Sequence, residues 1–197
     1  MLFRSCKALG HLNQGRYLDW IGADSYADSI EGGLVLLNRF PQPAGLAWLD
    51  RVVPIFLGRQ RDDGIVEGWY GDGNYARTAL MIGLYHTQGV RCQPWSPALC
   101  LGALRQGEKL LLAIRSDQPW KGRVIFDRPR HRLHLNLPFN YPRLNEFPEW
   151  FIAEPNSTYQ LTPRTGKKLV KTGAQLADGV FFSVKASETL TVEVRKR

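Results

Sequence analysis

The spacing of the hydrophobic residues changes about halfway along the chain, and this change limits the folds that the sequence can adopt. Before Trp95, apolar residues recur every three to four positions, which is the period of amphipathic helices. After Ala98 they alternate with polar residues in short segments separated by Gly, Pro, Asn or Asp, which is typical of antiparallel strands. We therefore expect an α+β protein with two domains, a helical domain over residues 1–95 and an antiparallel β-sandwich over residues 96–197.

Three helices are expected in the first half of the chain. They span residues 28–39, 46–60 and 75–88. Asp28 or Ser29 can cap the first helix, and Pro41 stops it sharply. In the third helix, small and apolar residues form a face that permits close packing against a neighbouring helix. This face consists of Ala76, Ala79, Leu80, Gly83 and Leu84.

The second half of the chain predicts eight short strands. They span residues 99–104, 109–115, 122–127, 132–135, 158–162, 167–171, 180–184 and 189–194. Residues 105–108 are typical of a hairpin turn. His131 and His134 are three positions apart, so on a strand they would point to opposite faces and could not share a metal ion. The Pro-rich and aromatic-rich stretch 136–155 predicts a long, packed surface loop.

The excess positive charge of the chain is confined to its second half. Residues 1–95 carry nine basic and nine acidic side chains, whereas residues 96–197 carry seventeen basic and nine acidic ones, so the net charge of +8 belongs to the expected sandwich. Such a surface can attract an acidic glycan or a nucleic acid, and it can equally be an ordinary solvated face. The chain has neither an RNP-like nor a helix-turn-helix signature, which argues against nucleic acid.

No stretch of the sequence approaches the roughly 18 apolar residues of a membrane-spanning helix. The first residues lack the apolar core of a signal peptide. We therefore expect a soluble chain without a membrane partner, although a full-length form could still be exported. The three cysteines, Cys6, Cys92 and Cys100, have no C-x-x-C spacing and predict neither a disulfide framework nor a zinc cluster. No cofactor and no metal are expected.

Acidic residues of the helical half fall at connections and lie close in sequence to aromatic residues. Aromatic rings stack on the apolar faces of sugars, and two carboxylates roughly 5–10 Å apart supply the general acid and base for glycosidic cleavage. The candidate catalytic residues are Asp72, Glu67 and Asp28. The candidate substrate-binding residues are Trp69, Tyr70, Asp24, Tyr26 and Arg77. An Asp near a helix start also stabilises the helix, so Asp28 and Asp72 have a purely structural interpretation as well.

The glycine-rich segment at 64–78, with the sequence GIVEGWYGDGNYART, is the most distinctive in the chain. Its glycines allow a tightly turning backbone that can bring Trp69 and Tyr70 to a surface. It lacks the G-x-x-x-x-G-K pattern of a phosphate-binding loop, and it lacks the third glycine of the dinucleotide fingerprint. A nucleotide site is therefore not expected here.

The helical hairpin at 28–60, the D-G-x-x-x-G-W-Y-G-D-G turn at 63–73 and the following helix, joined directly to a β domain, resemble the C-terminal end of bacterial six-hairpin proteins. In that superfamily an (α/α) toroid of glycoside hydrolase or polysaccharide lyase type precedes a β-sandwich. The resemblance implies that the helices are part of such a toroid and that a carbohydrate substrate lies in a cleft at one end of it. The residues that match such a cleft are Asp24, Asp28, Glu67, Trp69, Tyr70 and Asp72.

A closed toroid of that type needs many more helices than the three or four that this chain offers. The resemblance therefore implies that further N-terminal helices of the same protein, or another chain, complete the cleft, and that the isolated chain is inactive. Within this hypothesis, glycosidic hydrolysis is favoured over lyase elimination. The alternative is a non-catalytic module whose basic sandwich binds an acidic glycan or a protein partner.

Overall fold

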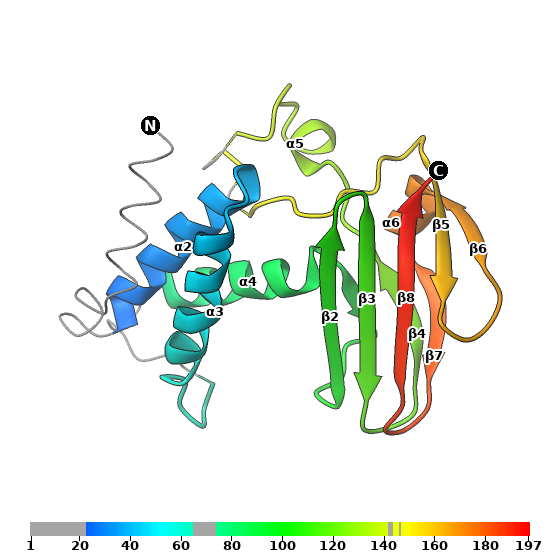
Figure 1. The fold of residues 1–197 in the computed structure, drawn as a ribbon, viewed down its shortest axis with the longest axis horizontal. Coiled ribbons are helices and arrows are strands. Elements are labelled where there is room, and N and C mark those ends of the chain that lie inside the picture. Colours follow the sequence, from blue (N-terminus) through cyan, green and yellow to red (C-terminus); the bar gives the residue numbers. More distant parts are fainter. Residues whose placement is uncertain (1–22, 65–73, 142–143, 146) are drawn as a thin grey trace. The chain divides into compact units, whose positions relative to one another are not determined.

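The computed structural model describes residues 23–64, 74–141, 144–145 and 147–197. Helices come first and two antiparallel sheets follow, which confirms the α+β class (Figure 1). Contacts divide the chain into two compact units, residues 1–83 and 84–197, so the division comes earlier than position 95. Within the described ranges, no helix combines the length and the apolar character needed to cross a membrane.

The described part of the chain contains five helices. They are α2 (Ala23–Arg39), α3 (Pro43–Leu57), α4 (Asn74–Thr87), α5 (Arg130–Leu133) and α6 (Gly173–Asp178). The end of α2 at Arg39 confirms the prediction. Its predicted start is wrong, because the helix already includes Ala23 and Asp28 lies inside it rather than at its cap.

Helices α2 and α3 form a hairpin that packs through two glycines (Figure 1). A Cβ added at Gly33 would lie 2.7 Å from Cζ3 of Trp48, and one added at Gly45 would lie 2.7 Å from Cδ2 of Leu37. Both of these large side chains are almost completely buried. Each glycine therefore makes room for a side chain of the opposite helix, and this allows the two helices to approach closely.

The buried face of α4 differs from the one predicted. Tyr75, Thr78 and Ile82 are buried at helical spacing, and the ring of Tyr75 stacks on Phe56 of α3 with the centroids 6.3 Å apart. The residues of the predicted face are exposed or only partly buried. They are Ala76, Ala79, Leu80, Gly83 and Leu84. Burying an aromatic ring removes more apolar area from water than burying alanines, which explains why the aromatic face points inward.

In the described part of the second unit, eight strands form two antiparallel sheets (Figure 1). One sheet has the order β1-β4-β7 and consists of β1 (Arg91–Gln93), β4 (Trp120–Ile125) and β7 (Val180–Val184). The other has the order β2-β3-β8-β5-β6 and consists of β2 (Leu99–Gln106), β3 (Lys109–Ser116), β8 (Thr189–Lys196), β5 (Thr158–Pro163) and β6 (Leu169–Thr172). Seven of the predicted strands are confirmed, whereas β1 was not predicted.

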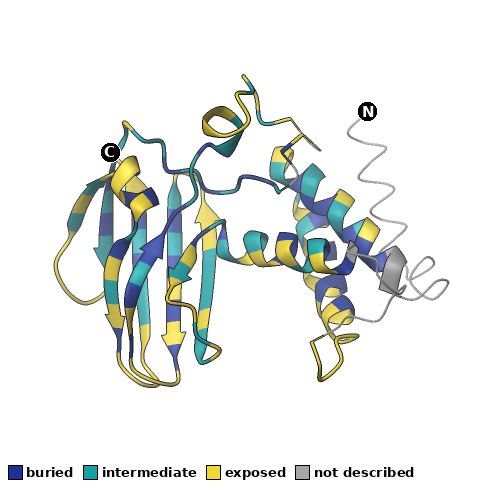
Figure 2. Ribbon diagram, turned by 180° about the vertical axis from the view of Figure 1, so that it is seen from behind, coloured by how far each residue is buried: buried dark blue, intermediate teal, exposed yellow. Residues whose placement is uncertain are grey.

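The two sheets share one hydrophobic core, to which alternate residues of the strands contribute (Figure 2). In the central pair of strands, Leu112 of β3 lies opposite Val192 of β8, and both residues are almost completely buried. Val124 of β4 and Val180 of β7 enter the same core from the other sheet. The alternation in the sequence thus corresponds to one face of each sheet turned inward.

The predicted hairpin at 105–108 is confirmed. Gln106 pairs with Lys109, so Gly107 and Glu108 form a two-residue loop between β2 and β3. Gly107 has φ +59°, a conformation that this kind of tight turn requires and that glycine adopts without strain.

The two described cysteines lie in the second unit and form no disulfide. Cys100 is exposed on β2, whereas Cys92 is partly buried on β1. Burial raises the pKa of the Cys92 thiol to about 11, so this thiol stays protonated at neutral pH and is a poor nucleophile. Cys6 lies outside the described residues.

The strand predicted at 132–135 is wrong, because α5 occupies its first part. The amide of His131 donates a hydrogen bond of 2.8 Å to Oε1 of Glu149, and the amide of His134 donates one of 2.9 Å to the carbonyl of Arg130. A carboxylate from a distant loop thus stabilises the first turn of this short helix. The interpretation that His131 and His134 point to opposite faces of a strand is wrong as well, since they are one helical turn apart.

We expect Gly33→Ala to lower the free energy of unfolding by about 1–3 kcal/mol, because the new methyl group would overlap the buried ring of Trp48. The matched control is Gly32→Ala in the same helix, where no atom lies within 4 Å of the added Cβ. This control should raise stability by about 0.5–1 kcal/mol through helix propensity. Urea unfolding followed by circular dichroism measures both. Equal effects of the two substitutions would contradict the close packing of α2 on α3.

Candidate functional site

Four of the predicted site residues belong to the glycine-rich segment before α4. They are Glu67, Trp69, Tyr70 and Asp72, and they lie outside the described residues. The described structure places the other four, which are Asp24, Tyr26, Asp28 and Arg77, on α2 and α4.

The first turns of α4 lie against the first half of α2. The hydroxyl of Thr78 donates a hydrogen bond of 3.4 Å to the carbonyl of Ala27, and both residues are fully buried. One residue earlier in α4, Nη2 of Arg77 forms an ion pair of 2.5 Å with Oε2 of Glu31. In the sequence the glycine-rich segment leads directly into α4, so the helix that follows this segment is attached to the helix that carries Asp24 and Asp28.

Three acidic positions of α2 belong to one face of the helix. Positions 24, 28 and 31 are four and three residues apart, which is the spacing of neighbours on a helix surface. Asp28 is exposed and Glu31 is partly buried, while the side chain of Asp24 is outside the described part of the structure. The earlier start of α2 thus turns acidic residues that looked like separate loop positions into one row along a helix.

Two predicted substrate-binding residues have structural contacts. The ring of Tyr26 is 4% exposed and belongs to the core of the helical unit. Its main contacts are therefore with core residues and not with a stacked sugar ring. The guanidinium of Arg77 is engaged with Glu31, and about a third of its side chain remains exposed. Arg77 therefore places a positive charge at one end of the acidic row, where it can balance carboxylates or meet an acidic ligand. Glu31, its partner, was not among the predicted site residues.

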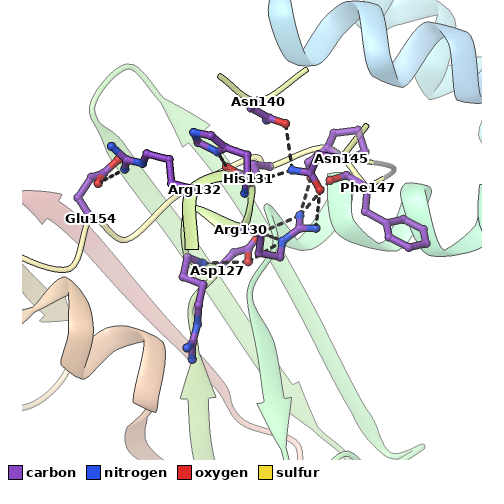
Figure 3. A network of polar contacts seen from close by, with 11 residues as sticks. Asp127, Arg130, His131, Arg132, Asn140, Asn145, Phe147 and Glu154 are labelled. Atoms are coloured by element: carbon purple, nitrogen blue, oxygen red, sulfur yellow. Dashed lines mark hydrogen bonds and ion pairs between the residues drawn. The ribbon is translucent and has the colours of Figure 1, made fainter. Parts of the chain in front are cut away.

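The second unit contains a polar network centred on Arg130 (Figure 3). Its guanidinium forms an ion pair with Asp127, with Nε 3.1 Å from Oδ1, and donates to Oδ1 of Asn145 and to the carbonyl of Phe147 at 3.2 and 3.0 Å. Asp127 also accepts a hydrogen bond from the amide of Arg128 at 2.9 Å. Arg130 is thus held on several sides and cannot turn without leaving buried polar groups unsatisfied.

A buried carboxylate, Glu149, extends this network. Its side chain is only 3% exposed and lies 2.8 Å from Nδ1 of His131, while its other oxygen accepts from the amide of His131 and from Nδ2 of Asn145. The carboxylate oxygens can accept from both amide groups, and Nδ1 of the imidazole lies at hydrogen-bond distance from the second oxygen. This pair orients the imidazole of His131 and fixes the long loop against α5.

Sequence reasoning missed the network in the second unit. Its partners come from α5 and from the loop up to eighteen positions further on, and no local pattern joins them. The available signal was the dense run of basic residues from Arg128 to Arg132 beside Asp127, between the strands predicted at 122–127 and 132–135. Pro129 just before α5 was the local sign that this run starts a turn rather than a strand.

Among the described residues, no group of three or more His, Cys, Asp or Glu side chains is arranged to hold a metal ion. No protein-family model matches the sequence, and no curated protein matches it.

We expect Glu149→Gln to lower the free energy of unfolding by about 1–3 kcal/mol, because an amide nitrogen would replace one of two acceptors that face buried donors. The matched control is Glu154→Gln, which removes an ion pair with Arg132 that is half exposed on both sides. Such surface pairs contribute about 0–1 kcal/mol. Denaturant unfolding measures both variants, and a loss in Glu149→Gln no larger than in the control would contradict a structural role for the buried carboxylate.

Proposed function

We propose that this chain is the C-terminal part of a carbohydrate-active protein of the six-hairpin type and that its helices form part of an α/α toroid that lines a sugar cleft. The observation that supports this most directly is the acidic row on α2, with Arg77 of α4 paired to its last member. The helix that follows the glycine-rich segment is thereby attached to a row of carboxylates, as a cleft built from both would require.

The proposed reaction is hydrolysis of a glycosidic bond rather than elimination. Hydrolysis needs one carboxyl group that protonates the leaving oxygen and a second that acts as base or nucleophile. Asp72 and Glu67 of the glycine-rich segment and Asp28 of α2 are the proposed carboxyl groups. Trp69 and Tyr70 would stack on sugar rings, and Asp24 would accept hydrogen bonds from hydroxyl groups. The Tyr26 ring supports α2 from inside the helical core.

The cleft would be completed by helices outside this chain. In its described part the first unit contributes α2, α3 and residues 74–83 of α4, which is fewer helices than a closed toroid contains. We therefore propose that further helices of the same protein or of another chain supply the remaining wall, and that the isolated chain does not turn over substrate.

The test is turnover of a panel of polysaccharides by the full-length protein, measured as released reducing ends. Asp72→Asn or Glu67→Gln should lower kcat by about 10²–10⁴-fold if the residue transfers a proton. The matched control is Asp50→Asn, an exposed carboxylate of α3, which should leave kcat unchanged. Unchanged turnover in both test variants would remove these residues from the catalytic set. An unsaturated product detected by its ultraviolet absorbance would instead indicate a lyase.

A second candidate function is a non-catalytic module that binds an acidic glycan or a partner, and the charge of the second unit favours it. Residues 84–197 carry eighteen basic and nine acidic side chains. If the sandwich binds acidic polymers through this charge, its affinity for uronate or sulfated polymers should fall steeply as salt is raised from about 0.05 to 0.5 M. Binding measured by calorimetry that does not depend on salt would contradict this function.

A further inference from the structure

A pocket of about 500 Å³ lies in the second unit beside the Arg130 network. Leu84 and Phe147 contribute apolar surface, and its polar lining consists of Arg91, Asp127, Arg128, Arg130 and His134. Its volume falls within the roughly 300–1,000 Å³ that is typical of small-ligand sites. All of its lining residues belong to residues 84–197.

The pocket lining carries more positive charge than its own carboxylate balances. Asp127 is the acidic residue of the lining, and it is already paired with Arg130. Among the described residues, neither Arg91 nor Arg128 has a carboxylate within ion-pair distance. Arg128 makes one long contact of 3.5 Å to the carbonyl of Ala177. Two guanidinium groups on one concave surface therefore have no carboxylate partner in the described part of the chain, which concentrates a positive potential there.

The backbone brings these two guanidinium groups to the same region. Arg91 on β1 pairs in register with Ile125 at the end of β4, and Arg128 follows Ile125 by three residues. Arg130 lines the same pocket and is fixed by its ion pair with Asp127 (Figure 3). The binding groups thus rest on adjacent strands and a cross-linked turn rather than on a free loop, which reduces the ordering that binding would require.

We propose that this pocket binds the carboxylate of an acidic sugar residue through Arg91 and Arg128. A guanidinium group offers two parallel N–H donors that match the two oxygens of a carboxylate. The apolar surface of Leu84 and Phe147 suits the apolar face of a sugar ring. The assignment of the ligand as a sugar rests on the function proposed above, whereas the preference for an anion rests on the pocket alone.

Isothermal titration calorimetry with the full chain tests this site. The probes are oligogalacturonate and oligomannuronate, with methyl-esterified oligogalacturonate as a probe of the same skeleton without charge. Arg91→Gln and Arg128→Gln should each weaken uronate binding at least about tenfold, because each removes a charge-assisted pair of hydrogen bonds. The matched control is Arg195→Gln on β8, which removes the same charge from an exposed position outside the pocket and should leave the affinity within about twofold. Thermal unfolding of each variant checks that it is folded.

Uronate binding that is lost in both pocket variants, kept in Arg195→Gln and absent for the methyl ester would support the site. The site would be overturned if neither uronate binds, if the ester binds equally well, or if Arg195→Gln loses as much affinity as the pocket variants. Inorganic phosphate that competes as strongly as the uronates would overturn the assignment to a sugar. Turnover of a neutral polysaccharide that depends on Glu67 and Asp72 would leave the proposed function intact even if this pocket binds nothing.

Discussion

The long loop between α5 and β5 depends for its packing on the hydrogen bonds and the ion pair of the Arg130 guanidinium. The side chain of Arg130 is 26% exposed, and a partly buried cation is costly unless its donors are satisfied. Here Asp127, Asn145 and the carbonyl of Phe147 accept from them. These partners come from just after β4 and from a long loop whose described residues form no named strand. Ordering such a loop costs conformational entropy, which the network offsets through several hydrogen bonds made at one centre. The buried Glu149 extends the same centre to α5.

The strands could be predicted from the sequence because burial of one face of a sheet appears directly as alternation. The rows of Leu112 on β3 and Val192 on β8 are examples. Residues with special backbone properties also gave correct predictions. Pro41, which has no N–H donor, marked the end of α2, and Gly107, which adopts a positive φ without strain, marked the hairpin turn. The prediction failed where a distant partner decides the local structure. The run 132–135 alternates polar and apolar residues and so fits a strand, yet the carboxylate of Glu149 stabilises a helical turn there.

The same distinction holds for the helices and the candidate site. The small residues of α4 predicted a packing face that is not the buried one. A helix buries the face that removes the most apolar area from water, and Tyr75 packed on Phe56 buries more area than alanines do. The spacing of Asp24, Asp28 and Glu31 was present in the sequence, and only the wrong start of the helix concealed that the three positions share a face. The ion pair of Glu31 with Arg77 joins residues 46 positions apart, so no local pattern could reveal it.

The basic side chains of the second unit have different electrostatic surroundings on its open surface and in its pocket. Several of its cations form pairs on the open surface, such as Lys109 with Glu193, where water screens them and little free energy is gained or lost. Arg91 and Arg128 line a concave surface, where field lines are concentrated and water screens the charges less than on an open face. The fold can keep both groups at the pocket because Arg130 alone neutralises Asp127. Under this proposal, a carboxylate ligand would meet two guanidinium groups that pair with no carboxylate among the described residues, so the pocket, rather than the net charge of the unit, would select an acidic partner.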